Sequence, residues 1–106
     1  MKFQPTTLRI ESIIFDNVDT KVLIKGETFK NHLSYCSEMF ISFAELNLIL
    51  NDLQQKNPNV NVCELFVEEQ IGSGYSQTIF DAKQIENPTI DLSNFSFGNE
   101  KMLIRA

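Results

Sequence analysis

The sequence has no tryptophan, only two cysteines and no long hydrophobic run. Its apolar stretches, such as IIF at 13–15 and LFV at 65–67, are far shorter than the roughly 18 residues that a membrane-spanning helix needs. The first twelve residues lack the apolar core and the small-residue cleavage site of a signal peptide. We therefore expect no membrane span, and a cytoplasmic protein whose cysteines are free thiols.

Histidine is scarcer still, because His32 is the only one, and it lies four residues before Cys36. A nucleophilic cysteine needs an imidazole within hydrogen-bond reach, and a spacing of four supplies it in a helix, whereas residues 31–40 show no clean helical pattern. Structural zinc sites use four ligands, of which this stretch offers two. The sequence therefore predicts no catalytic residues, no metal site and no cofactor, and it favours an ordinary connecting segment over 31–40.

Basic residues are few in the middle of the chain. Residues 31–100 contain two lysines and ten acidic residues, and the whole chain has a formal net charge of −5. Binding to DNA or RNA requires several Lys or Arg side chains gathered on one surface, so we expect no nucleic-acid partner. An acidic surface keeps a protein soluble, and it also attracts a basic partner.

The chain does contain enough apolar material for one core. Its 106 residues are close to the commonest domain size, and 42% of them are hydrophobic, including nine phenylalanines. A chain of this length buries roughly two-thirds of its unfolded surface. No internal repeat, low-complexity tract or linker divides it, so residues 1–106 are predicted to form a single globular domain.

The clearest local pattern predicts a helix over residues 43–56. Ser42 is placed to cap its N-terminus, and Glu45, three residues later, can return a hydrogen bond to the N–H of the cap residue. The NP pair at 57–58 ends the helix, since the residue before a proline avoids the helical region. Apolar residues recur at helical spacing on one side. They are Phe43, Leu46, Ile49, Leu50 and Leu53.

The segments around this helix alternate with the period of strands. Residues 7–15 and 20–26 predict a hairpin around a turn at 16–19, with a β-bulge near Ser12, where the alternation slips. Residues 60–71 and 75–85 predict a second hairpin around the turn GSG.

Two further short strands are predicted at 89–97 and 101–105. The predicted fold is α+β, with one amphipathic helix packed on a mostly antiparallel sheet, in the order β-β-α-β-β-β(-β).

Alternation along residues 60–71 places Cys63 on the inner face of its strand, while Glu64, Phe66 and Glu68 share the opposite face. An aromatic residue with charges around it is typical of an interface with a hydrophobic centre and a polar rim. These three residues are therefore candidates for binding a partner. The alternative is that Phe66 lies under the helix as part of the core.

These patterns favour a non-enzymatic, small acidic protein-binding or accessory domain, whose partner is another protein or a second copy in a homodimer. One alternative is a small ligand-binding protein or enzyme, with a pocket between helix and sheet and with His32, Cys36 and Tyr75 at its mouth. The other is a structural subunit that assembles through strand edges. A deep pocket lined by polar groups favours the ligand-binding alternative, and a flat acidic surface beside apolar residues favours the binding domain.

Overall fold

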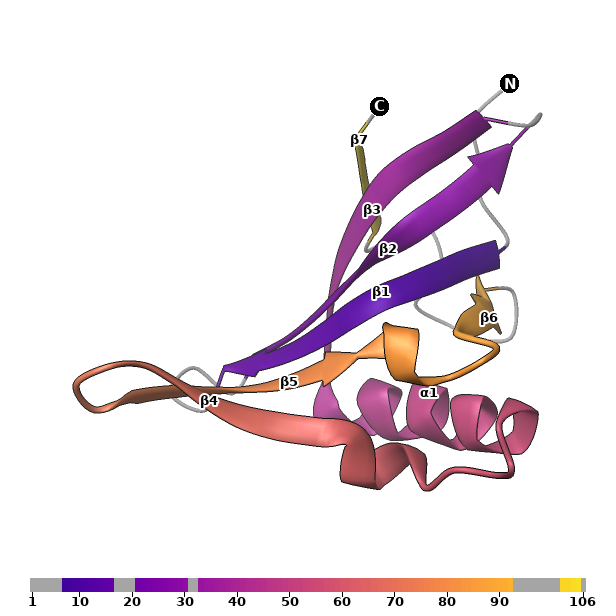
Figure 1. The fold of residues 1–106 in the computed structure, drawn as a ribbon. Coiled ribbons are helices and arrows are strands. Elements are labelled where there is room, and N and C mark those ends of the chain that lie inside the picture. Colours follow the sequence, from indigo (N-terminus) through magenta and orange to yellow (C-terminus); the bar gives the residue numbers. More distant parts are fainter. Residues whose placement is uncertain (1–6, 17–20, 31–32, 93–101, 106) are drawn as a thin grey trace.

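The computed structural model describes residues 7–16, 21–30, 33–92 and 102–105, which form one α-helix, seven strands and two short 3-10 helices (Figure 1). In chain order these are β1 (Thr7–Asp16), β2 (Lys21–Lys30), β3 (Leu33–Ile41), α1 (Phe43–Lys56), η1 (Val62–Leu65), β4 (Phe66–Gly72), β5 (Tyr75–Asp81), η2 (Ala82–Gln84), β6 (Thr89–Asp91) and β7 (Met102–Arg105). Across these ranges, α1 and the shorter helical turns fall short of the length and apolar character that crossing a membrane demands.

The strands form one antiparallel sheet in the order β4-β5-β1-β2-β3-β7, and β6 pairs with β1 off this path. On one side β1 pairs with β2. On its other side β1 has two successive neighbours, β6 along Thr7–Arg9 and β5 along Ser12–Asp16. One helix on an antiparallel sheet is the predicted α+β class, which is therefore confirmed.

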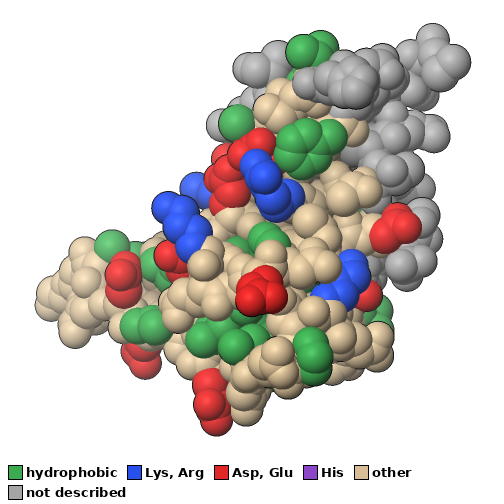
Figure 2. Space-filling view, turned by 45° about the vertical axis from the view of Figure 1, so that its right-hand side comes forward, with side chains coloured by type: hydrophobic (Ala, Val, Ile, Leu, Met, Phe, Trp, Pro, Cys, Tyr) green, Lys and Arg blue, Asp and Glu red, His purple; other side chains and the backbone are tan. Residues whose placement is uncertain are grey.

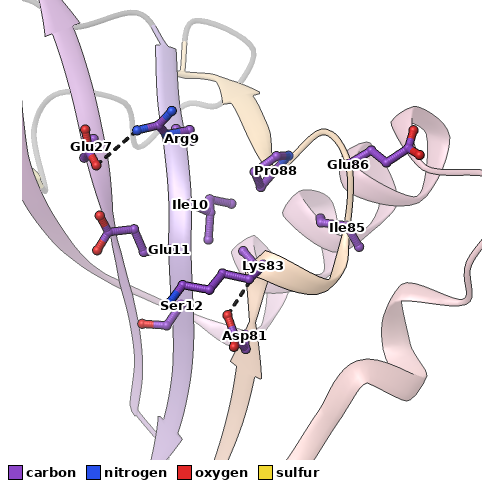
Figure 3. A pocket seen from close by; sticks show the side chains of 11 residues that line it. Arg9, Ile10, Glu11, Ser12, Glu27, Asp81, Lys83, Ile85, Glu86 and Pro88 are labelled. Carbon is purple, nitrogen blue, oxygen red and sulfur yellow. Dashed lines mark hydrogen bonds and ion pairs between the residues drawn. The ribbon is translucent and has the colours of Figure 1, made fainter.

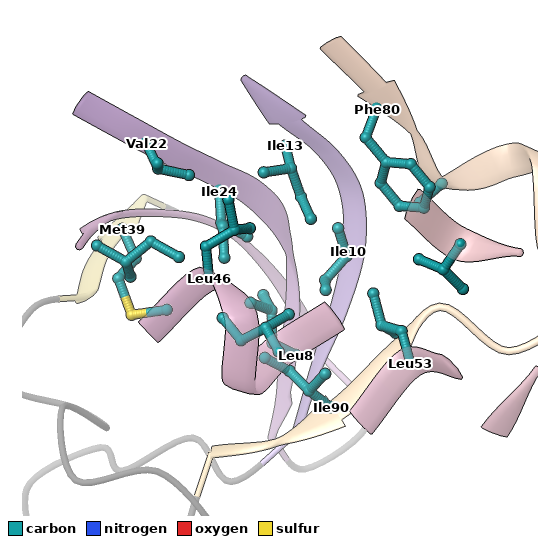
Figure 4. Close-up of a cluster of buried hydrophobic side chains, with 14 of the residues drawn as sticks. Leu8, Ile10, Ile13, Val22, Ile24, Met39, Leu46, Leu53, Phe80 and Ile90 are labelled. Carbon is teal, nitrogen blue, oxygen red and sulfur yellow. The ribbon is translucent and has the colours of Figure 1, made fainter. Parts of the chain in front are cut away.

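The hydrophobic core lies between α1 and one face of the sheet, called here the inner face (Figure 4). Burying apolar side chains in this layer is the main stabilising contribution to such a fold. Its central members are Leu8, Ile10 and Ile13 of β1, Val22 and Ile24 of β2, Met39 and Ile41 of β3, Leu46, Ile49 and Leu53 of α1, and Phe80 of β5.

Helix α1 begins and ends where the sequence predicted. The Ser42 backbone N–H donates to Glu45 Oε1 over 2.8 Å, and the Glu45 N–H donates to Ser42 Oγ over 3.2 Å, so the capping box is complete. At the other end, the buried Asn57 amide donates to the carbonyl oxygens of Leu53 and Asn87, both over 2.9 Å. Asn57 therefore ties the end of the helix to the segment that precedes β6.

The register of β1 against β2 shifts between Ile10 and Ser12, which confirms the predicted bulge. Gly26 lies opposite Ile10 at this point. A Cβ atom at Gly26 would clash with the carbonyl oxygen of Arg9, so the close approach of the two strands requires glycine. The second predicted hairpin is present too, with β4 and β5 joined through Gly74, whose φ is +79°.

The segment at 33–41 is a strand, so the prediction of a connecting segment there was wrong. The strand β2 also continues to Lys30, past its predicted end at Gly26. The alternation in β3 was hidden because one inward position holds a polar residue. Ser37 is buried there, and its Oγ lies 3.0 Å from Thr28 Oγ1 of β2, which is buried as well.

The predicted strand at 60–71 is a 3-10 turn followed by a strand that starts at Phe66. The turn reverses the predicted faces, because Val62 is fully buried and Cys63 is exposed. The prediction that Cys63 belongs to the core was therefore wrong. The Gln54 side chain of α1 holds the turn in place, since its Oε1 accepts the Val62 N–H over 2.9 Å.

Candidate docking surface

The face of the sheet opposite α1, called here the outer face, carries a row of apolar residues that crosses five adjacent strands. Ile14 pairs with Leu23 on one side and with Ile79 on the other. The row continues through the pairs of Leu23 with Phe40 and of Ile79 with Val67. In spatial order this apolar row is Val67 (β4), Ile79 (β5), Ile14 (β1), Leu23 (β2) and Phe40 (β3).

The ends of the apolar row are open to solvent. Val67 is 55% exposed and Phe40 is 54% exposed, while the three central residues are half-buried between their neighbours in the sheet. Successive side chains of a strand point to opposite faces, so the row lies on the reverse side of the layer that holds Ile13 and Ile24. Within the part of the chain that the structure describes, the apolar row is thus a second hydrophobic layer that no helix covers as α1 covers the first.

Polar residues lie on both sides of the apolar row, two positions away along each strand. The same pairings that align the apolar row align these two polar rows. One consists of Asp81, Ser12, Lys25 and Glu38, and the other of Glu69, Gln77, Asp16 and Lys21. A hydrophobic centre between polar margins is the usual anatomy of a protein–protein interface.

A groove of about 730 Å³ adjoins the polar row of Ser12 and Asp81, where β1 changes partner from β5 to β6 (Figure 3). The Ile10 N–H donates to the Pro88 carbonyl oxygen over 2.8 Å at this change, and η2 lies between the two partner strands. Ser12 and Asp81 line the groove and also belong to the first polar row, so the groove and the outer face form a continuous surface.

The charged groups around the groove are partly neutralised by one another. Arg9 Nη2 lies 3.1 Å from Glu27 Oε1, and the Arg9 guanidinium also lies over the Phe29 ring, 5.3 Å from its centroid. Asp81 Oδ1 accepts the Lys83 N–H over 3.0 Å and so caps η2. Figure 2 shows acidic and basic side chains interspersed over the visible face, with hydrophobic side chains between them.

The three predicted partner-binding residues do not share one strand face. Glu64 is exposed on η1, and Glu68 is exposed on β4. Phe66 turns inward, where its ring stacks on Phe80 with 5.2 Å between centroids, and it packs against the core. Contact between a partner and these residues stays a prediction, and the exposed apolar residue of this strand is the next one, Val67.

Two of the three residues of the predicted ligand pocket, Cys36 and Tyr75, are described, and the structure does not bring them together. Cys36 and Tyr75 are both exposed, but Cys36 lies in β3 opposite Glu27, whereas Tyr75 begins β5 at the tip of the β4–β5 hairpin. Neither residue lines the groove. His32 lies outside the described residues. Within those residues, no cluster of three or more His, Cys, Asp or Glu side chains is placed to hold a metal ion.

The apolar row was not predicted, although the sequence contains a signal for it. Several strands contain three consecutive apolar residues, among them residues 13–15, 22–24 and 39–41. A half-covered strand needs an apolar residue at every second position, so the middle residue of each triplet must lie on the opposite face. Those middle residues are Ile14, Leu23 and Phe40.

Comparison of this chain with protein-family models, with curated proteins and with solved structures found no match. Its function is therefore inferred from its own residues.

Proposed function

We propose that this protein is a non-enzymatic docking domain that binds another protein chain through its outer face. The observation that carries the proposal is the apolar row, which crosses five strands, is more than half exposed at both ends and lies between two polar rows. An apolar surface of this kind, rimmed by polar residues, marks interaction sites on monomeric proteins.

The outer face is a better docking surface than a strand edge. The edge strand β4 carries Glu68 and Glu69 and has a register shift between Gln70 and Gly72. Charges and bulges are devices that discourage an edge strand from pairing with another chain. This argues against the alternative of a subunit that assembles through the β4 edge.

A protein partner also suits the surface better than a small ligand or a nucleic acid does. Five of the six charged residues in the groove are exposed and the sixth, Glu27, is half-buried, so no fully buried charged side chain lines the groove to orient a small molecule. Four of its six charged residues are acidic, which opposes a phosphate backbone. We extend the proposal to a cytoplasmic location, which is supported by the two exposed free thiols.

The proposal is tested by placing a charge at the exposed end of the apolar row. Phe40→Asp should abolish protein binding, because an unpaired carboxylate would be buried within the contact. Leu48→Asp on α1 is the matched control, since Leu48 is 56% exposed and lies outside the apolar row. Native protein and both variants are immobilised, and the proteins captured from cell lysate are quantified; self-association is measured by sedimentation.

Binding that is lost with Phe40→Asp but retained with Leu48→Asp supports docking through the outer face. If the two variants bind equally well, both to lysate proteins and to themselves, the proposal is wrong. Thermal unfolding of each variant verifies that the comparison is made between folded proteins.

A further inference from the structure

We propose that the partner of the outer face is a second copy of this chain, packed face to face about a twofold axis that runs parallel to β1. This inference rests on the proposed function and names its partner. Two sheets of the same twist pack well with their strands roughly aligned, at about −30°. The pairing registers then determine which residues meet across the contact.

The apolar row complements itself under this symmetry. A twofold axis along β1 reverses the order of the strands, so that β5 of one copy faces β2 of the other and β4 faces β3. Ile14 then meets its own copy, Leu23 meets Ile79, and the large Phe40 side chain meets the small Val67 side chain. Large residues facing small ones allow the two layers to interdigitate.

Charge selects this axis over the other one. With the axis along β1, Lys25 of each copy lies opposite Asp81 of the other, which gives two ion pairs in each dimer. An axis along the apolar row would instead set Lys21 opposite Lys25, a like-charged contact that appears twice. In the chosen arrangement Asp16, at the end of β1, lies on the axis opposite its own copy.

The size of the contact indicates how strongly the copies should associate. Five strands span about 24 Å, and three rows of alternate residues span about 20 Å, which gives a footprint of roughly 500 Å² on each chain. The total of about 1,000 Å² falls at the low end of biological interfaces, among transient complexes. The dimer should therefore form reversibly, as a transient complex.

Charge reversal provides a test specific to this symmetry. Lys25→Glu alone creates two acid–acid contacts and Asp81→Lys alone creates two base–base contacts, so each should raise the dissociation constant at least about tenfold. An equimolar mixture of the two variants restores both ion pairs in a heterodimer. Sedimentation equilibrium should show two nearly monomeric variants whose mixture has the mass of a dimer. Because Asp81 caps η2, Asp81→Asn, which keeps an acceptor there, is measured as a second variant and should weaken the native dimer less.

The outcomes separate this inference from the proposed function. A native chain that stays monomeric at about millimolar concentration, or two variants that do not recover on mixing, overturns the twofold dimer. If Phe40→Asp nevertheless abolishes capture of lysate proteins, the outer face still binds a different protein. If Phe40→Asp changes neither capture nor self-association, both proposals fall.

Discussion

Ile13 and Ile14 are adjacent residues of the same kind that the sheet sends to opposite faces. Ile13 is fully buried on the inner face under α1, and Ile14 lies half-buried in the apolar row of the outer face. In β2 the same contrast separates Ile24 from Leu23. In the proposed function, the inner face stabilises the fold and the outer face binds a partner.

Truncating each of the two isoleucines tests most directly whether the two faces contribute differently to stability. Ile13→Ala should lower the free energy of unfolding by about 3 kcal/mol, because it removes a buried side chain and leaves a cavity. Ile14→Ala should cost less than about 1 kcal/mol, since its surroundings are open to solvent on one side, and should weaken binding instead. Urea titration measures the stability of both variants, and sedimentation measures their self-association. Equal losses of stability would mean that the two faces are equally important to the fold.

The bulge that precedes the two isoleucines in β1 lies opposite Gly26. Gly26→Ala should lower the free energy of unfolding by roughly 2–3 kcal/mol, since the added Cβ clashes with the Arg9 backbone and the strands must separate. Gly72→Ala is the control, because a Cβ atom there has no neighbour within 4 Å. A Gly26→Ala protein as stable as the control would show that the strands adjust at no cost.

Much of this fold was predictable because its determinants are local. The helix was predicted from Ser42, Glu45 and the apolar spacing, all within fourteen residues, and the bulge from the slip in alternation near Ser12. The strand β3 was not, because its buried position at Ser37 holds a polar residue, whose partner across the sheet is Thr28 on another strand. That contact depends on tertiary structure, which alternation within one segment does not reveal.

The candidate site was harder to predict than the fold. Phe66 drew attention as an apolar residue on the wrong face, but the face was assigned from a strand that in fact begins after a 3-10 turn. A turn of one residue more or less reverses every later assignment of faces. The apolar row itself appears only when the registers of five strands are known.

Phe66 and Val67 repeat the contrast between the faces in β4. Phe66→Ala should lower the free energy of unfolding by about 2 kcal/mol, less than for a fully buried phenylalanine, because its ring stacks on Phe80 while remaining partly exposed. Val67→Ala should leave stability nearly unchanged and weaken self-association. Chemical unfolding measures the stability of each variant, and sedimentation measures its self-association. The expected difference between the two faces is contradicted if Phe66→Ala weakens association without lowering stability.

The smallest expected effect concerns the helix that covers the inner face. Ser42→Ala should lower the free energy of unfolding by about 1 kcal/mol, because the Glu45 N–H loses its side-chain acceptor. Ser42→Asp retains an acceptor at the cap and should keep the native stability. Since α1 contributes to the inner face alone, neither variant should change binding through the outer face, as measured by sedimentation at a temperature well below unfolding. A loss of binding with Ser42→Ala would show that the two faces are coupled through the helix, and that stabilisation and binding are not fully separated between them.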